Sequence, residues 1–179
     1  KLSAHGLEPS PRATDQMLLR RVYLDFTGLP PSLTDLKKVS PGLHNPSLGP
    51  IIDSLCNTMD YAENMAFDWM ELARYADTHG YQDDFERSMW PWRDWVIKAF
   101  SENMPYNEFV TVQLAGDLLP NANKETILAT GFNRNHKITA EGGVIPEEYR
   151  VEYVEDRTNT FGTAFLGMTL ECARCHDHK

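Results

Sequence analysis

The chain lacks long apolar runs, basic clusters and an N-terminal apolar segment of the kind found in signal peptides. No stretch approaches the roughly 20 apolar residues of a membrane-spanning helix, so we expect no membrane span. The net charge is −9 and no basic run occurs, which makes nucleic acid and anionic membrane surfaces poor partners. The chain begins at Lys1 rather than at a methionine, and it therefore reads as a mature or trimmed product.

The composition is that of a soluble globular domain. Hydrophobic residues make up 41% of the chain and charged residues 24%, close to the averages for such proteins. A length of 179 residues is enough for one domain with a proper core. We therefore predict a single domain over residues 1–179.

Almost every periodic segment has the helical period rather than the alternation of a strand. Thr14 is a predicted N-cap for a helix over residues 15–26, and Pro146 with two following glutamates predicts a helix that runs towards the C-terminus. An apolar stripe predicts another helix over 60–78, ended by Gly80. The prediction is a mainly α fold, an irregular helical domain with long loops. Shorter helices are predicted from residue 32, over 50–56, from 91 to about 100, ahead of Gly116 and over 124–130.

The C-terminal residues carry the sharpest chemical signal, because Cys172, Cys175 and His176 form a Cys-x-x-Cys-His motif. Positions i, i+3 and i+4 share one face of a helical turn. Two thiols there can form thioethers to the vinyl groups of a haem while the imidazole reaches the iron, which is the attachment signature of c-type haem. The motif predicts covalently bound haem c, with His176 as the proximal ligand.

Other chemistries fit the motif less well. A structural zinc site needs about four nitrogen or sulfur ligands, and the remaining thiol, Cys56, is far away in sequence. A thioredoxin-type redox pair follows a strand in a βαβ pattern, and no such pattern is visible. Two alternatives stay open. One is a ligand-binding helical haem protein, and the other is a non-haem structural or carbohydrate-interaction domain whose cysteines hold a metal or form a disulfide.

Several further residues are candidates for the haem environment. His136 is the best candidate for the second axial ligand, although a surface or hydrogen-bonded loop histidine is the competing interpretation. Met168 is expected to pack in the core rather than bind iron. Arg150 and Arg157 are seven residues apart, two turns along one helical face, so both can point at haem propionates or at an anionic substrate.

The chain also resembles a known family, the cytochrome-associated proteins abundant in planctomycetes. The matching blocks occur in the family's order and span nearly the whole chain. They are RRVYLDFTGLPPS (20–32), DWMELARYADTHGYQDD (68–84), MWPWRDWVIKAF (89–100), MPYNEFVTVQLAGDLLP (104–120), ATGFNRNHKI (129–138), EGGVIPEEYRVEYVEDRTNT (141–160) and LGMTLECARCHDHK (166–179).

The resemblance implies a large extracytoplasmic or periplasmic protein, often with a cytochrome c domain before this region and another conserved domain after it. By motif, Cys172, Cys175 and His176 match the haem-attachment block. The expected role is electron transfer, or service as the redox module of an oxidoreductase, with a redox protein or a downstream domain as partner. Family members continue beyond residue 179, so we expect this chain to be a fragment of a longer multidomain protein. Whatever covers the distal haem face would then come from residues 133–143 or from that continuation.

Overall fold

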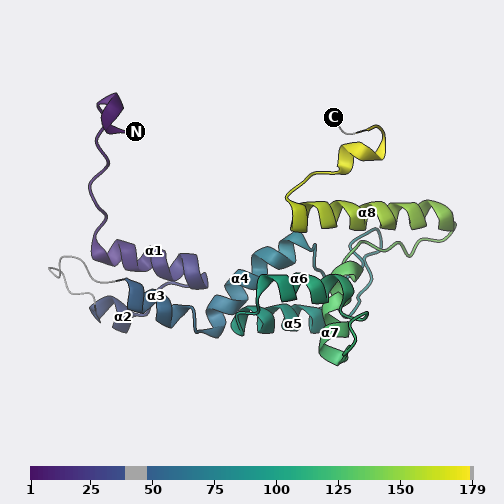
Figure 1. The fold of residues 1–179 in the computed structure, drawn as a ribbon, viewed down its shortest axis with the longest axis horizontal. Helices are drawn as coiled ribbons and strands as arrows, with labels where there is room; N and C mark the ends of the chain where they lie inside the picture. The colour runs from purple at the N-terminus through teal and green to yellow at the C-terminus, as the bar shows by residue number, and fades with distance from the viewer. Residues whose placement is uncertain (39–47, 178–179) are drawn as a thin grey trace. The chain divides into compact units, whose positions relative to one another are not determined.

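The computed structural model describes residues 1–38 and 48–177 (Figure 1). The described residues form eight α-helices and three short 3-10 helices, and no β-strand occurs among them. The mainly α prediction is therefore confirmed. The elements are η1 (Ser3–His5), α1 (Asp15–Thr27), α2 (Leu33–Lys38), α3 (Gly49–Leu55), α4 (Met59–Leu72), α5 (Trp90–Ser101), α6 (Tyr106–Ala115), α7 (Lys124–Ala129), η2 (Thr130–Arg134), α8 (Pro146–Leu166) and η3 (Glu171–Arg174).

The chain divides into two compact units, Lys1–Tyr61 and Ala62–Lys179. We call them unit 1 and unit 2. The boundary lies inside α4, so that the first residues of this helix belong to unit 1 and the rest to unit 2. The expectation of one haem-c domain within a longer protein stays a prediction.

Unit 1 is a small helical assembly built around α1 and α3, which pack against each other. Thr14 caps α1 as predicted, because its hydroxyl accepts a hydrogen bond from the Met17 amide at 3.3 Å. The helix ends at Gly28, whose φ of 69° is a left-handed conformation that glycine adopts without steric cost. The apolar side chains buried here are few, chiefly Leu19 and Leu55.

Unit 2 has an aromatic core contributed by α4, α5, α6 and η2. Phe109 lies between two tryptophans, with ring centroids 5.0 Å from Trp69 and 5.7 Å from Trp95. Trp92 and Phe132 are almost completely buried beside them. Such large rings remove extensive apolar area from water, so this cluster is the main source of the stability of unit 2.

The predicted helix over 60–78 is wrong at its C-terminal end, because α4 stops at Leu72. Arg74 adopts a left-handed conformation with φ of 57°, although no glycine marks the stop. Its guanidinium forms an ion pair with the carboxylate of Asp156 and donates a further bond to the Asp156 carbonyl at 3.1 Å. A contact with a residue 82 positions away thus helps to end the helix, and local sequence cannot show it.

The long loop after α4 returns to the core at α5. Asp77, in the preceding loop, caps the N-terminus of α5. Its Oδ1 accepts hydrogen bonds from the amides of Met89 and Trp90, each 2.7 Å away. A carboxylate at this end also complements the helix dipole. One isolated bridge, between Thr78 and Glu86, closes the loop.

Candidate functional site

The C-terminal motif is positioned by a reversal of the chain at the end of α8. The helix ends at Gly167 with φ of 62°, and the Met168 amide then donates to the Gly162 carbonyl at 2.9 Å. Leu170 packs directly on Gly162, where a Cβ would lie 2.7 Å from the Leu170 Cδ1. These two glycines therefore let the last residues fold back over α8, as the yellow segment of Figure 1 shows.

The motif itself begins in the 3-10 helix η3. The Cys175 amide donates to the Cys172 carbonyl at 3.4 Å, and residues i and i+3 of a 3-10 turn eclipse each other. Both thiols are free and exposed. They therefore lie on one side of a single turn, as attachment to two vinyl groups requires, although the turn is 3-10 rather than α-helical.

His176 follows the turn with an exposed imidazole. Its Nδ1 lies 2.9 Å from the Asp177 carbonyl oxygen. In the tautomer that donates this bond, Nε2 is the nitrogen left to bind a metal, and such a second partner orients ligating histidines in many metal sites. The donor set of two thiols and an oriented imidazole fits a c-type haem.

Arg174, between the two cysteines, holds the motif on α8. Its guanidinium pairs with Glu152 and also with Glu155, the latter at 2.9 Å. The hydrogen bond and negative charge of Glu152, with Glu155 nearby, raise the pKa of Arg174. Lys137 also lies 3.9 Å from Glu152, so Glu152 lies next to both the motif and the segment that contains His136.

His136 is half-buried against α8. Its ring centroid is 4.8 Å from that of Tyr153, and its Nδ1 is 2.8 Å from the Lys137 carbonyl oxygen. Burial lowers the pKa of His136, and the positive charges of Arg157 and Arg87 lower it further. A neutral imidazole is the form that binds a metal, but the role of His136 as second axial ligand stays a prediction.

The two arginines predicted to meet propionates lie in different surroundings. Arg150 forms a two-pronged ion pair with Glu147, at 2.8 and 2.7 Å, on the exposed first turns of α8. Arg157 donates from Nε to the Tyr153 carbonyl at 3.1 Å, and its positive charge helps to lower the pKa of His136. Arg157 is therefore better placed than Arg150 to act together with His136, while contact of either with a haem stays a prediction.

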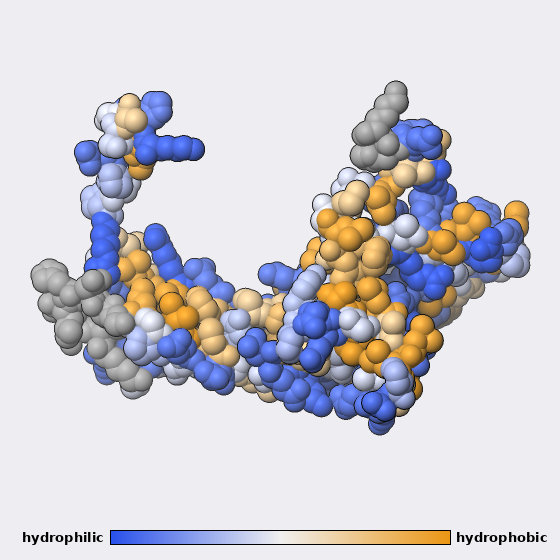
Figure 2. All heavy atoms as spheres, in the orientation of Figure 1, coloured by the Kyte–Doolittle hydropathy of each residue, from blue (hydrophilic) through white to orange (hydrophobic). Residues whose placement is uncertain are grey.

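Exposed apolar side chains lie near the C-terminal end of α8. In Figure 2 the atoms near the C-terminal end of α8 are largely orange, and Phe161, Leu166 and Met168 are 36%, 54% and 50% exposed. The expectation that Met168 packs in the core is therefore wrong. It follows the turn at Gly167, where its backbone rather than its side chain is engaged with α8.

Within the described residues, no group of three or more histidine, cysteine or acidic side chains is arranged to hold a metal ion. His178 and Lys179 lie outside that part of the chain. Across residues 1–38 and 48–177, no helix combines the length and apolar character needed to span a membrane.

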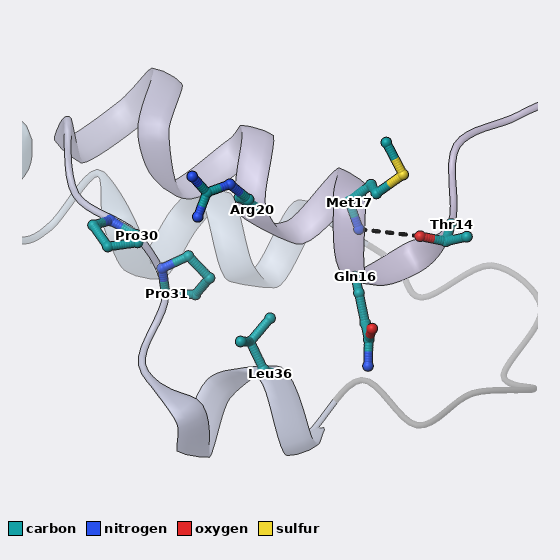
Figure 3. A pocket seen from close by; sticks show the side chains of 7 residues that line it. All are labelled: Thr14, Gln16, Met17, Arg20, Pro30, Pro31 and Leu36. Carbon is teal, nitrogen blue, oxygen red and sulfur yellow. Dashed lines mark hydrogen bonds between the residues drawn. The ribbon is translucent and has the colours of Figure 1, made fainter.

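A cavity of about 230 Å³ in unit 1 lies between α1, α2 and the Pro30–Pro31 turn (Figure 3). Among the described residues that line it, Arg20 is the one ionisable group, beside apolar groups such as Met17 and Leu36, and none of them is a histidine or a cysteine.

Sequence reasoning missed a second cavity, in unit 2, with a volume of about 510 Å³. It is lined by His79, Arg87, Arg134 and His136, among others. Nothing in the local sequence shows that the loop of His79 lies beside the segment after η2. The backbone bond from the Ile138 amide to the His79 carbonyl, at 3.0 Å, brings them together.

In the comparison with known families, residues 1–179 match the PSCyt2 family, described as protein of unknown function (DUF1549). No curated protein and no solved structure matches the chain. Because the family match covers every residue, the chain belongs to the PSCyt2 family.

Proposed function

We propose that this chain is an extracytoplasmic c-type haem module that carries electrons, alone or as the redox part of an oxidoreductase. The observation that supports this most strongly is the turn that contains Cys172 and Cys175, with both thiols free, exposed and on one side, followed at once by the imidazole of His176. Bound haem would supply an iron that gains and loses one electron.

The chain's own residues would hold and orient that group. Cys172 and Cys175 would form the thioethers, and the carbonyl of Asp177 would fix the His176 ring. Arg174 keeps the motif on α8 through Glu152 and Glu155. The exposed apolar side chains near the end of α8 offer surface that an apolar macrocycle can cover. Each Å² of apolar surface removed from water stabilises the bound state by roughly 25 cal/mol.

His136 is our candidate for the sixth ligand, with Arg157 or Arg150 towards the propionates. Covalent haem is attached outside the bacterial cytoplasm, so we propose a periplasmic or otherwise extracytoplasmic location. The partner would be a redox protein or a downstream domain of the same protein.

Expression with a cytochrome c maturation system in an exported form tests the proposal. Acid–acetone extraction should leave the red chromophore on the polypeptide. The double variant Cys172→Ser/Cys175→Ser should lose it completely, whereas Cys56→Ser, which removes the cysteine of unit 1, should retain it. Chromophore that extracts into the solvent, or a purified wild-type protein with tetrahedral zinc and no haem absorption, would contradict the proposal.

The second axial ligand has its own test. His136→Ala should shift the haem absorption bands of the loaded protein, because loss of a strong-field ligand changes the spin state of the iron. His5→Ala, in unit 1, is the matched control and should leave the spectrum unchanged. An unchanged spectrum in His136→Ala would show that another group occupies the sixth position.

A further inference from the structure

The cavity of unit 2 has the size and lining of a small-molecule site. Its volume of about 510 Å³ falls within the range of roughly 300–1,000 Å³ typical of ligand pockets. Apolar side chains, including Met89, Trp92, Ile127 and Ile138, form one part of its wall. Two arginines and two histidines form another: Arg87, Arg134, His79 and His136.

The charged side chains that line this cavity are positive. No acidic side chain is found among the described residues that line the cavity, although the whole chain carries a net charge of −9. Within residues 1–38 and 48–177, neither Arg87 nor Arg134 forms an ion pair with a carboxylate. Burial lowers the pKa of Arg87, and the nearby charge of Arg134 lowers it further, while Asp77 and Asp84 partly oppose this. A pocket lined by positively charged groups attracts anions.

Arg87 also fixes the backbone that forms this wall. Its guanidinium donates to the carbonyls of Arg134 and His136, each at 3.0 Å, and to that of Asn135 at 3.3 Å. Its Nε is buried without a partner among the described residues, as are the Nδ1 of His79 and both side-chain amide atoms of Asn135. Asn135 is 3% exposed. Buried polar groups are normally satisfied, so these four atoms are exceptions, and they are closed off from solvent behind the wall.

We propose that this cavity binds a small organic carboxylate, whose anionic group meets Arg87 and Arg134 while its apolar body lies against Trp92. Guanidinium groups form strong, charge-assisted bonds with carboxylates. A neutral sugar fits less well, since the lining lacks the carboxylates that would accept bonds from its hydroxyls. An inorganic anion would leave the apolar wall unused. This inference does not require haem attachment, because no cysteine takes part, but the cavity shares His136 with the haem proposal.

Titration with benzoate, followed by NMR of the histidine imidazoles, tests the inference. Benzoate should produce saturable shifts at His79 and His136 and none at His5 of unit 1, whereas uncharged benzamide should produce none at either site. Arg134→Gln should weaken benzoate binding about tenfold, the loss expected for one charge-assisted bond. Arg134 is exposed, so this variant should fold. Arg12→Gln removes the same charge from unit 1 and should leave the affinity unchanged.

The remaining outcomes distinguish a free carboxylate ligand from a haem propionate. Benzoate should bind both to the haem-free Cys172→Ser/Cys175→Ser and to the haem-loaded protein, because Arg87 and Arg134 line the cavity in each. Binding only to the haem-free variant would show that the cavity accepts a haem propionate, and it would overturn the free-ligand inference. Absence of saturable binding, equal affinity for benzoate and inorganic phosphate, or unchanged affinity in Arg134→Gln would also overturn it. Failure of haem attachment would leave this inference intact.

Discussion

A single buried amide ties the aromatic core of unit 2 together. Gln113 is fully buried; its Oε1 accepts from the Trp69 indole at 2.9 Å, and its Nε2 donates to the Phe109 carbonyl at 3.1 Å. Gln113→Leu fills similar space but leaves the indole N–H of Trp69 without an acceptor. We therefore expect a loss of about 1–3 kcal/mol in the free energy of unfolding. Denaturant unfolding measures it, with exposed Gln16→Leu as control. Equal values for the two variants would contradict the prediction.

Tyr75 is expected to titrate unusually late. Burial, together with the hydrogen bond and negative charge of Asp77, raises the pKa of Tyr75 to about 12, while Arg93 partly opposes the shift. The folded pKa is above the unfolded value near 10, so this group's contribution to stability is complete below pH 10 and is lost as the pH rises from about 10 to 12. The difference in tyrosinate absorbance between wild type and Tyr75→Phe should have its midpoint near pH 12. A midpoint near 10 would refute this.

At the scale of elements, the junction of α6 and α7 depends on a close backbone approach at Gly116. A Cβ there would lie 2.1 Å from the Thr126 carbonyl oxygen and 2.4 Å from that of Val112. Neither backbone atom can move aside without shifting a helix, so Gly116→Ala should destabilise unit 2 by about 1–3 kcal/mol. Gly142→Ala, where the added Cβ meets open space, should stay within about 0.5 kcal/mol of wild type. Thermal or denaturant unfolding compares the two.

Ion pairs, and no buried apolar residue of η3, connect η3 to α8. Arg174 is half-exposed, so solvent screens its ion pairs with Glu152 and Glu155, and they should add little to global stability. Arg174→Gln should therefore speed amide hydrogen exchange in residues 171–177 while leaving the unfolding midpoint of unit 2 nearly unchanged. Arg150→Gln, which removes an exposed pair elsewhere on α8, should not affect exchange there. Unchanged exchange in Arg174→Gln would show that the ion pairs do not hold the motif.

For the molecule as a whole, the two units differ in how much apolar surface they bury. Unit 2 contains a cluster of eleven buried apolar residues, whereas the buried apolar residues among those described in unit 1 are Leu19, Pro31 and Leu55. Because local stability follows buried apolar contact, amides of α1 should exchange with solvent faster than those of α5. Hydrogen exchange read by mass spectrometry measures this directly. Uniform protection across both helices would show that the whole chain unfolds as one cooperative body.

Local sequence determined much of the secondary structure. The capping group of Thr14, the stop at Gly28 and the start at Pro146 each act within a few residues of the chain, and such short-range signals are readable without a fold. The Cys172–His176 spacing is equally local, which is why the candidate haem site could be predicted from sequence, while haem binding itself awaits its test.

Tertiary structure decided what depends on residues distant in sequence. The early end of α4 needs Asp156 beside Arg74, the capping of α5 needs Asp77, and the exposure of Met168 needs the reversal at Gly167. The cationic cavity exists because Arg87 binds the carbonyls of residues 134–136. Periodicity and spacing describe only neighbours along the chain, whereas these features arise from segments that meet when folding buries the aromatic core.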